Sequence, residues 1–139
     1  SKGRQQNIER LIHAFQMEPH MSGLISSYSH GMKQKVALIA AFSHNPKFLV
    51  LDEPFVGLDP EAFIALKDQI KMLCRKRSSV LFSSHILDVV EKLCNKISII
   101  KDGRLLYSGT TEELIGVEGL EEAFMELNSN ERFDPSIEK

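Results

Sequence analysis

The sequence is poor in the residue types that mark several specialised classes of protein. Its 139 residues include no tryptophan and two cysteines, Cys74 and Cys94, which lack Cys-x-x-Cys spacing. We expect both to be buried, reduced thiols, which excludes a disulfide-rich scaffold. The five histidines show no metal-ligand spacing with each other or with the cysteines, so a metal-free protein is the expectation.

Charge and hydropathy exclude two further classes. The formal net charge is −2, so no excess of basic side chains points to nucleic acid. No apolar run approaches the roughly 18–20 residues needed to span a bilayer, and residues 1–4 contain no apolar signal region. With 42% hydrophobic and 26% charged residues, the composition is that of an ordinary globular protein with its own core.

Hydrophobic periodicity predicts alternating helices and strands. The four apolar residues 48–51 are typical of a strand buried on both faces, as in a parallel sheet. Asp102-Gly103 is the favoured two-residue turn of a hairpin. The order of elements predicts an α/β protein. Helices are expected over residues 7–15, 31–43, 60–73, 86–93 and 120–127, and strands over 48–51, 79–83, 96–101 and 104–108.

Two of these helices have recognisable starts. Ser29 is placed to cap the helix over 31–43, and Asp59 to cap the helix that begins at Pro60. The second helix is expected to bury a stripe of Val36, Ile39 and Ala40, and the third a face of Ala62, Leu66, Ile70 and Leu73.

Two adjacent carboxylates follow the first predicted strand. Asp52 and Glu53 emerge at the carboxyl end of that strand, where ligands of open α/β sheets bind. One carboxylate there can position Mg²⁺, and the other can orient or activate a water for phosphoryl transfer. The alternative is a polar strand end that leads into a turn.

Three further features are ambiguous when each is taken alone. Gly57-Leu58-Asp59-Pro60 is a turn and a helix cap. Ser83-Ser84-His85 follows the second strand, where an imidazole can donate to phosphate or simply cap a helix. In the segment from Tyr28 to Lys35, a serine and a glycine stand at a helix N-terminus. They could form an anion-binding site, or they could simply be part of an ordinary capped helix.

In their order and spacing, these features resemble the nucleotide-binding subunit of ABC transporters over essentially the whole chain. Tyr28 to Met32 resembles the ABC signature, and residues 48–53 resemble the Walker B strand. Gly57-Leu58-Asp59 is similar to the D-loop, and His85 to the switch histidine. The form Tyr-Ser-x-Gly-Met-Lys-Gln-Lys and the tail around residues 120–124 resemble the exporter branch with ABC-2-type membrane partners. The resemblance implies a P-loop NTPase fold, a mostly parallel sheet with flanking helices.

The resemblance also implies roles for the catalytic positions. Glu53 would polarise the attacking water, Asp52 would hold the Mg²⁺ shell, and His85 would contact the γ-phosphate. ATP and Mg²⁺ are the implied cofactors.

A second set of roles concerns the implied partner, another ATP-binding subunit. Ser29 and Gly31 would bind the γ-phosphate of the ATP held by that subunit, and Asp59 would face it across the dimer interface. His30 and Met32 stand where the signature more commonly has Gly and Gln, so the phosphate contact falls to Ser29 and Gly31. A membrane subunit of the transporter is the other implied partner.

The sequence contains no Gly-x-x-x-x-Gly-Lys-[Ser/Thr], the loop that normally wraps the phosphates of a nucleotide. We therefore expect a piece of a larger subunit, or the product of a truncated gene, that lacks the phosphate-loop strand. Within it, residues 1–45 would end the helical subdomain, 46–110 would form the catalytic α/β core, and 111–139 would be a helical tail.

Three functions remain open. The first is an ATPase that powers transport across a membrane, located in the cytoplasm at the inner face of the cell membrane, whose fragment alone is inactive. The second is a non-catalytic module that supplies the signature to a complete partner subunit. A generic α/β binding domain is the third.

Overall fold

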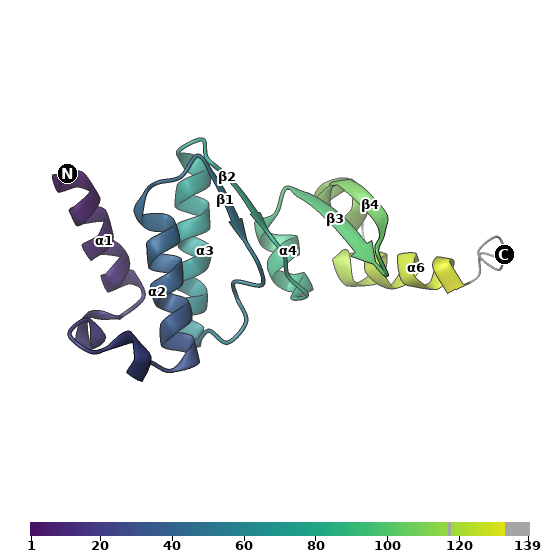
Figure 1. The fold of residues 1–139 in the computed structure, drawn as a ribbon. Coiled ribbons are helices and arrows are strands. Elements are labelled where there is room, and N and C mark those ends of the chain that lie inside the picture. Colours follow the sequence, from purple (N-terminus) through teal and green to yellow (C-terminus); the bar gives the residue numbers. More distant parts are fainter. Residues whose placement is uncertain (117, 133–139) are drawn as a thin grey trace. The chain divides into compact units, whose positions relative to one another are not determined.

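The computed structural model describes residues 1–116 and 118–132, and the chain divides into two compact units at residues 84 and 85. All the predicted helices and strands are present, while residues 133–139 of the predicted tail lie outside the described residues. The first unit contains α1 (Lys2–Ala14), η1 (Glu18–His20), η2 (Ile25–Ser27), α2 (His30–Ser43), β1 (Phe48–Leu51), α3 (Pro60–Arg75) and β2 (Ser79–Phe82) (Figure 1). The second contains α4 (Leu87–Leu93), β3 (Lys96–Lys101), β4 (Arg104–Thr110), α5 (Thr111–Ile115) and α6 (Leu120–Arg132).

Strands β1 and β2 pair in parallel, as predicted, with α3 as the helix that connects them. The register runs from Phe48 opposite Ser79 to Leu51 opposite Phe82. Because parallel strands share one carboxyl edge, the residues that follow Leu51 and Phe82 emerge side by side.

One face of this strand pair is covered and the other is exposed, which corrects the prediction of a strand buried on both faces. Leu49 is 9% exposed, whereas Phe48 and Val50 are 61% and 60% exposed. Leu81, which pairs with Val50, is 58% exposed. The long helices of this unit, α1, α2 and α3, stand on one side of the strands (Figure 1). An unbroken apolar run therefore marks a strand with two apolar faces but does not say that both are packed.

Helix α3 buries the face that its sequence predicts. Asp59 caps it by accepting from the Ala62 amide at 2.8 Å. The aromatic ring of Phe55, in the loop after β1, packs against Phe63 of α3 and Phe82 of β2. This loop is therefore held against both elements. The four predicted core residues are all at most 4% exposed: Ala62, Leu66, Ile70 and Leu73.

The buried stripe of α2 differs from the prediction. Ile39 is buried as expected, but Val36 is half-buried and Ala40 is exposed, while Leu38 and Phe42 are buried. Helix α1 packs along α2, and the Asn7 side chain of α1 donates to the carbonyls at the end of α2. The covered face of α2 therefore includes Leu38 and Phe42 rather than Val36 and Ala40.

The second unit is a hairpin packed with short helices. Strands β3 and β4 pair antiparallel, and Asp102 and Gly103 both have positive φ, 49° and 74°, as the predicted turn requires. Ile97 and Ile99 of β3 form a buried cluster with Leu120 of α6. Among the described residues, the helices are too short or too polar to cross a membrane.

Candidate functional site

The hydroxyl group of Ser83 joins the ends of the two parallel strands. It donates to Asp52 Oδ1 at 2.5 Å and accepts from the backbone N–H of Glu53 at 2.8 Å. The Ser83 amide continues the strand pairing by donating to the Leu51 carbonyl at 3.1 Å. One side chain thus fixes both residues of the predicted carboxylate pair.

Sequence reasoning did not assign a role to Ser83. It singled out the segment 83–85 for its histidine, although a serine at the end of a strand beside two carboxylates was a usable signal. The bridge became visible only when the parallel register placed residues 52 and 83 together, 31 positions apart in the chain.

The backbone of Glu53 is strained. Its φ is 44°, in the left-handed region that non-glycine residues seldom occupy. Such residues cluster at functional sites, where the surrounding structure holds them in place. Here the hydrogen bond from the Glu53 amide to Ser83 supplies that constraint.

A pocket with a volume of about 370 Å³ is lined by both carboxylates and by residues of α2. Asp52 and Glu53 contribute charge, and His30 and Gln34 contribute further polar groups. His30, which replaces the commoner glycine of the signature, therefore lines the same pocket as the carboxylates. Leu38, Leu51 and Val56 are among the apolar residues that complete the lining.

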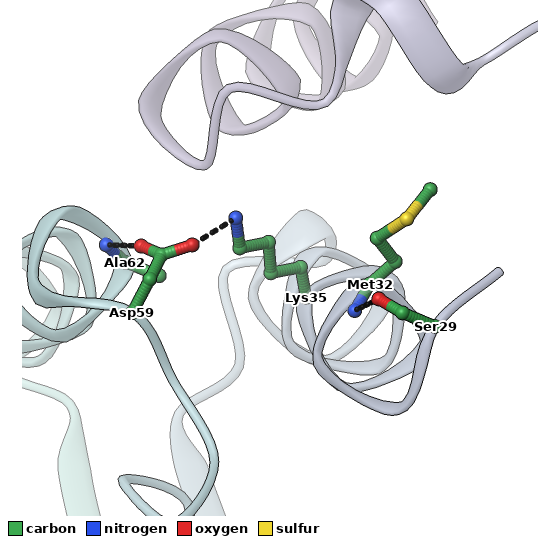
Figure 2. A network of polar contacts seen from close by, with 5 residues as sticks. All are labelled: Ser29, Met32, Lys35, Asp59 and Ala62. Atoms are coloured by element: carbon green, nitrogen blue, oxygen red, sulfur yellow. Dashed lines mark hydrogen bonds and ion pairs between the residues drawn. The ribbon is translucent and has the colours of Figure 1, made fainter.

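The start of α2 has the features of an anion site. Ser29 caps the helix, and its Oγ accepts from the Met32 amide at 3.2 Å (Figure 2). The first turn contains no acidic residue, so the partial positive charge of the helix N-terminus is not offset there. A Cβ on Gly31 would lie 3.3 Å from the Gly57 carbonyl oxygen, and the glycine permits this close approach.

Asp59 is paired within its own chain. Lys35 Nζ lies 2.8 Å from Asp59 Oδ2, and the Ala62 amide donates to the other carboxylate oxygen (Figure 2). The hydrogen bond from Lys35, followed by that from Ala62, lowers the pKa of Asp59 from its ordinary value. Asp59 remains about half exposed, so it can still meet another molecule.

The structure thus brings the predicted site residues together in two groups. Asp52 and Glu53 meet at Ser83, and Ser29 and Gly31 lie on the helix that contacts Gly57 and Asp59. His85 begins the second unit, and its role stays a prediction.

The described residues offer a magnesium ion only part of its ligands. Within residues 1–116 and 118–132, no three His, Cys, Asp or Glu side chains are grouped to hold a metal. Mg²⁺, however, is commonly held by one or two carboxylates, with waters and substrate phosphates as the other ligands. The oxygen donors of Asp52, Glu53 and Ser83 fit such a partial site.

Comparisons with known proteins identify relatives of this chain by sequence and by structure. A family model described as "AAA domain, putative AbiEii toxin, Type IV TA system" matches residues 13–91. The ABC transporter ATP-binding protein NatA of Bacillus subtilis (strain 168) is 37% identical over 107 residues, which cover 77% of this chain and 44% of NatA. The ABC-type transporter ATP-binding protein EcsA of the same organism is 36% identical over 116 residues, 84% of this chain and 47% of EcsA.

A solved structure gives the same result at the level of the fold. It is described as the ATP-binding subunit of an ABC transporter, and it matches with a TM-score of 0.86 and 32% identity over 92% of this chain and 55% of that chain. The chain spans about half the length of the curated relatives it matches. The predicted P-loop NTPase fold and the resemblance to ATP-binding subunits of ABC transporters are therefore confirmed, and the chain belongs to the family of that AAA domain model.

Proposed function

We propose that this chain is the part of an ATP-hydrolysing transporter subunit that carries the water-activating carboxylate and the signature helix. The observation that carries the proposal is the Ser83-bridged pair of Asp52 and Glu53 at the carboxyl edge of parallel strands. The names of the relatives support it, since they are ABC transporter ATP-binding proteins.

At the carboxylate pair, each residue has a separate task. Glu53 orients the attacking water and accepts its proton, and its left-handed backbone, fixed by Ser83, sets the direction of its side chain. Asp52 holds the Mg²⁺ shell through its carboxylate. When bound, Mg²⁺ would neutralise charge on the transferring phosphoryl group. His85 donates a hydrogen bond to the γ-phosphate.

At the start of α2, the chain serves a second ATP-binding subunit. Ser29 accepts from Met32 through Oγ, which leaves its hydroxyl proton to donate to the γ-phosphate of the ATP held there. Gly31 lets that phosphate approach the helix N-terminus. Asp59 faces the same subunit with its exposed side. The dimer couples hydrolysis to a membrane subunit, at the cytoplasmic face of the cell membrane.

The test is ATP hydrolysis by the full-length protein that contains this sequence. We expect Glu53→Gln to lower kcat by about 10²–10⁴, the usual effect of losing a base, while Mg-ATP still binds. Glu112→Gln, which changes an exposed glutamate of α5, is the matched control and should keep wild-type turnover. Wild-type turnover in Glu53→Gln would contradict the assignment.

The same experiment addresses the non-catalytic alternative. If the full-length protein carries no phosphate-binding loop and hydrolyses no ATP, the chain would act by contributing Ser29 and Gly31 of the signature to the nucleotide site of a complete partner subunit. Mixing it with a complete relative would then raise the turnover of that relative, and Ser29→Ala would remove the effect.

A further inference from the structure

Helix α2 is fastened at three points to the 54–59 segment, the loop between β1 and α3. Gln34 Nε2 donates to the Pro54 carbonyl at 2.7 Å. Gly31 packs so closely on Gly57 that a Cβ at residue 31 would lie 3.3 Å from the Gly57 carbonyl oxygen. These two contacts leave little room for the start of α2 to move independently of the loop.

The third point is the ion pair of Lys35 and Asp59. The Nζ to Oδ2 distance is 2.8 Å, and the side chain of Lys35 is only 14% exposed. The other carboxylate oxygen of Asp59 accepts from the Ala62 amide of α3. One carboxylate therefore ties α2 and α3 together.

This ion pair differs from the exposed pair of Asp88 and Lys92. That pair has the same 2.8 Å separation, but its side chains are 71% and 65% exposed and lie one turn apart on the same helix. Such a pair adds little beyond local helix stability. Lys35 and Asp59 are 24 residues apart and join separate elements, so their pairing fixes a tertiary arrangement.

From these contacts we propose that Lys35 is a positioning residue that holds Asp59 and the start of α2 as one rigid surface. The inference rests on the proposed function, in which Ser29, Gly31 and Asp59 all meet a second subunit. Ser29 caps α2 and Lys35 lies in its second turn, so both belong to one hydrogen-bonded helical segment. A shift of Asp59 at the subunit contact is therefore passed to the phosphate-facing end of α2.

A double-mutant cycle in the full chain tests the contact itself. Lys35→Met removes the charge at similar length, and Asp59→Asn keeps an oxygen for the Ala62 amide. We expect the two changes to be coupled by about fivefold or more in the unfolding equilibrium constant, the upper end for ion pairs of this exposure. The same cycle on Asp88 and Lys92 should give about twofold or less. Coupling at Lys35 no larger than in this control would overturn the inference.

The functional test measures kcat and KM in the full-length protein. Because Lys35 acts through Asp59, we expect Lys35→Met to lower kcat about tenfold through misplacement and to leave KM for ATP within about twofold. Lys35→Arg should restore turnover, and Lys92→Met should match the wild type. Wild-type kcat in Lys35→Met, with Glu53→Gln inactive, would refute the positioning role and leave the proposed function standing. Wild-type kcat in Glu53→Gln would refute the proposed function itself.

Discussion

Replacing Ser83 by alanine removes one oxygen atom and, with it, the link between the two strand ends. The hydroxyl group holds Asp52 Oδ1 at 2.5 Å and the Glu53 amide at 2.8 Å. The alanine variant leaves the Glu53 amide without this acceptor and removes one of the contacts that hold the strained Glu53 backbone.

The size of the effect follows from these two hydrogen bonds. A neutral hydrogen bond contributes about 1 kcal/mol, and one to a charged group about 1.5–3 kcal/mol. Ser83 and Asp52 are exposed, so water can take over part of the hydrogen bonding that the Ser83 hydroxyl provided. We therefore expect Ser83→Ala to lower the free energy of unfolding by about 1–2 kcal/mol, and the Glu53 amide to exchange about five- to thirtyfold faster.

Urea unfolding and amide hydrogen exchange measure the two quantities. With a slope of about 1–3 kcal/mol per molar urea, the midpoint should fall by roughly 0.5–1 M. Ser83→Thr retains the hydroxyl group and should stay close to the wild type. Ser98→Ala removes an exposed hydroxyl of β3, bonded to Ser108, and is the control for losing a serine. An unchanged midpoint together with unchanged exchange at Glu53 would refute the bridging role.

Three further predictions follow from the conformations and charges of single residues. Arg77 and Glu53 both have positive φ, 63° and 44°, so glycine at either position should raise the free energy of unfolding in urea by up to about 1 kcal/mol. Only Glu53→Gly should abolish turnover of the full-length protein; wild-type turnover in both glycine variants would contradict the role of Glu53. Lys35 lowers the pKa of Asp59 in the folded chain, so the ion pair stabilises the fold fully above the unfolded pKa of Asp59 and loses this effect as the pH falls through the folded pKa. Acid unfolding below about pH 4 should therefore be less steep in Lys35→Met, and identical unfolding curves would show that the pair contributes nothing. The 139-residue chain should bind Mg-ATP no tighter than about millimolar by calorimetry, because Asp52 adds negative charge and the sequence has no phosphate-wrapping loop; micromolar binding would contradict this.

Much of the fold could be predicted from the sequence because the signals are local. The cap of α3 needs only Asp59 and the amide three residues later, and the buried face of α3 follows from the helical repeat. The turn at Asp102-Gly103 depends on two residues that accept positive φ. The order of the motifs, which is also local information, was enough to indicate the family.

Other features depended on contacts between distant segments. An apolar run such as 48–51 shows that both faces of a strand are apolar, but only packing decides that Leu49 is covered while Val50 is exposed. The buried residues of α2 include Leu38 and Phe42 but not Val36, because the elements that pack on α2, α1 among them, decide which face is covered.

The sequence by itself determined the elements, their caps and the identity of the carboxylates, because each rests on residues within a few positions of one another. Only the tertiary structure decided how those carboxylates are held. Ser83 reaches Asp52 across 31 positions, and Lys35 reaches Asp59 across 24. A hydrogen bond acts over about 3 Å, so its partners are defined by strand register and helix docking rather than by spacing along the chain.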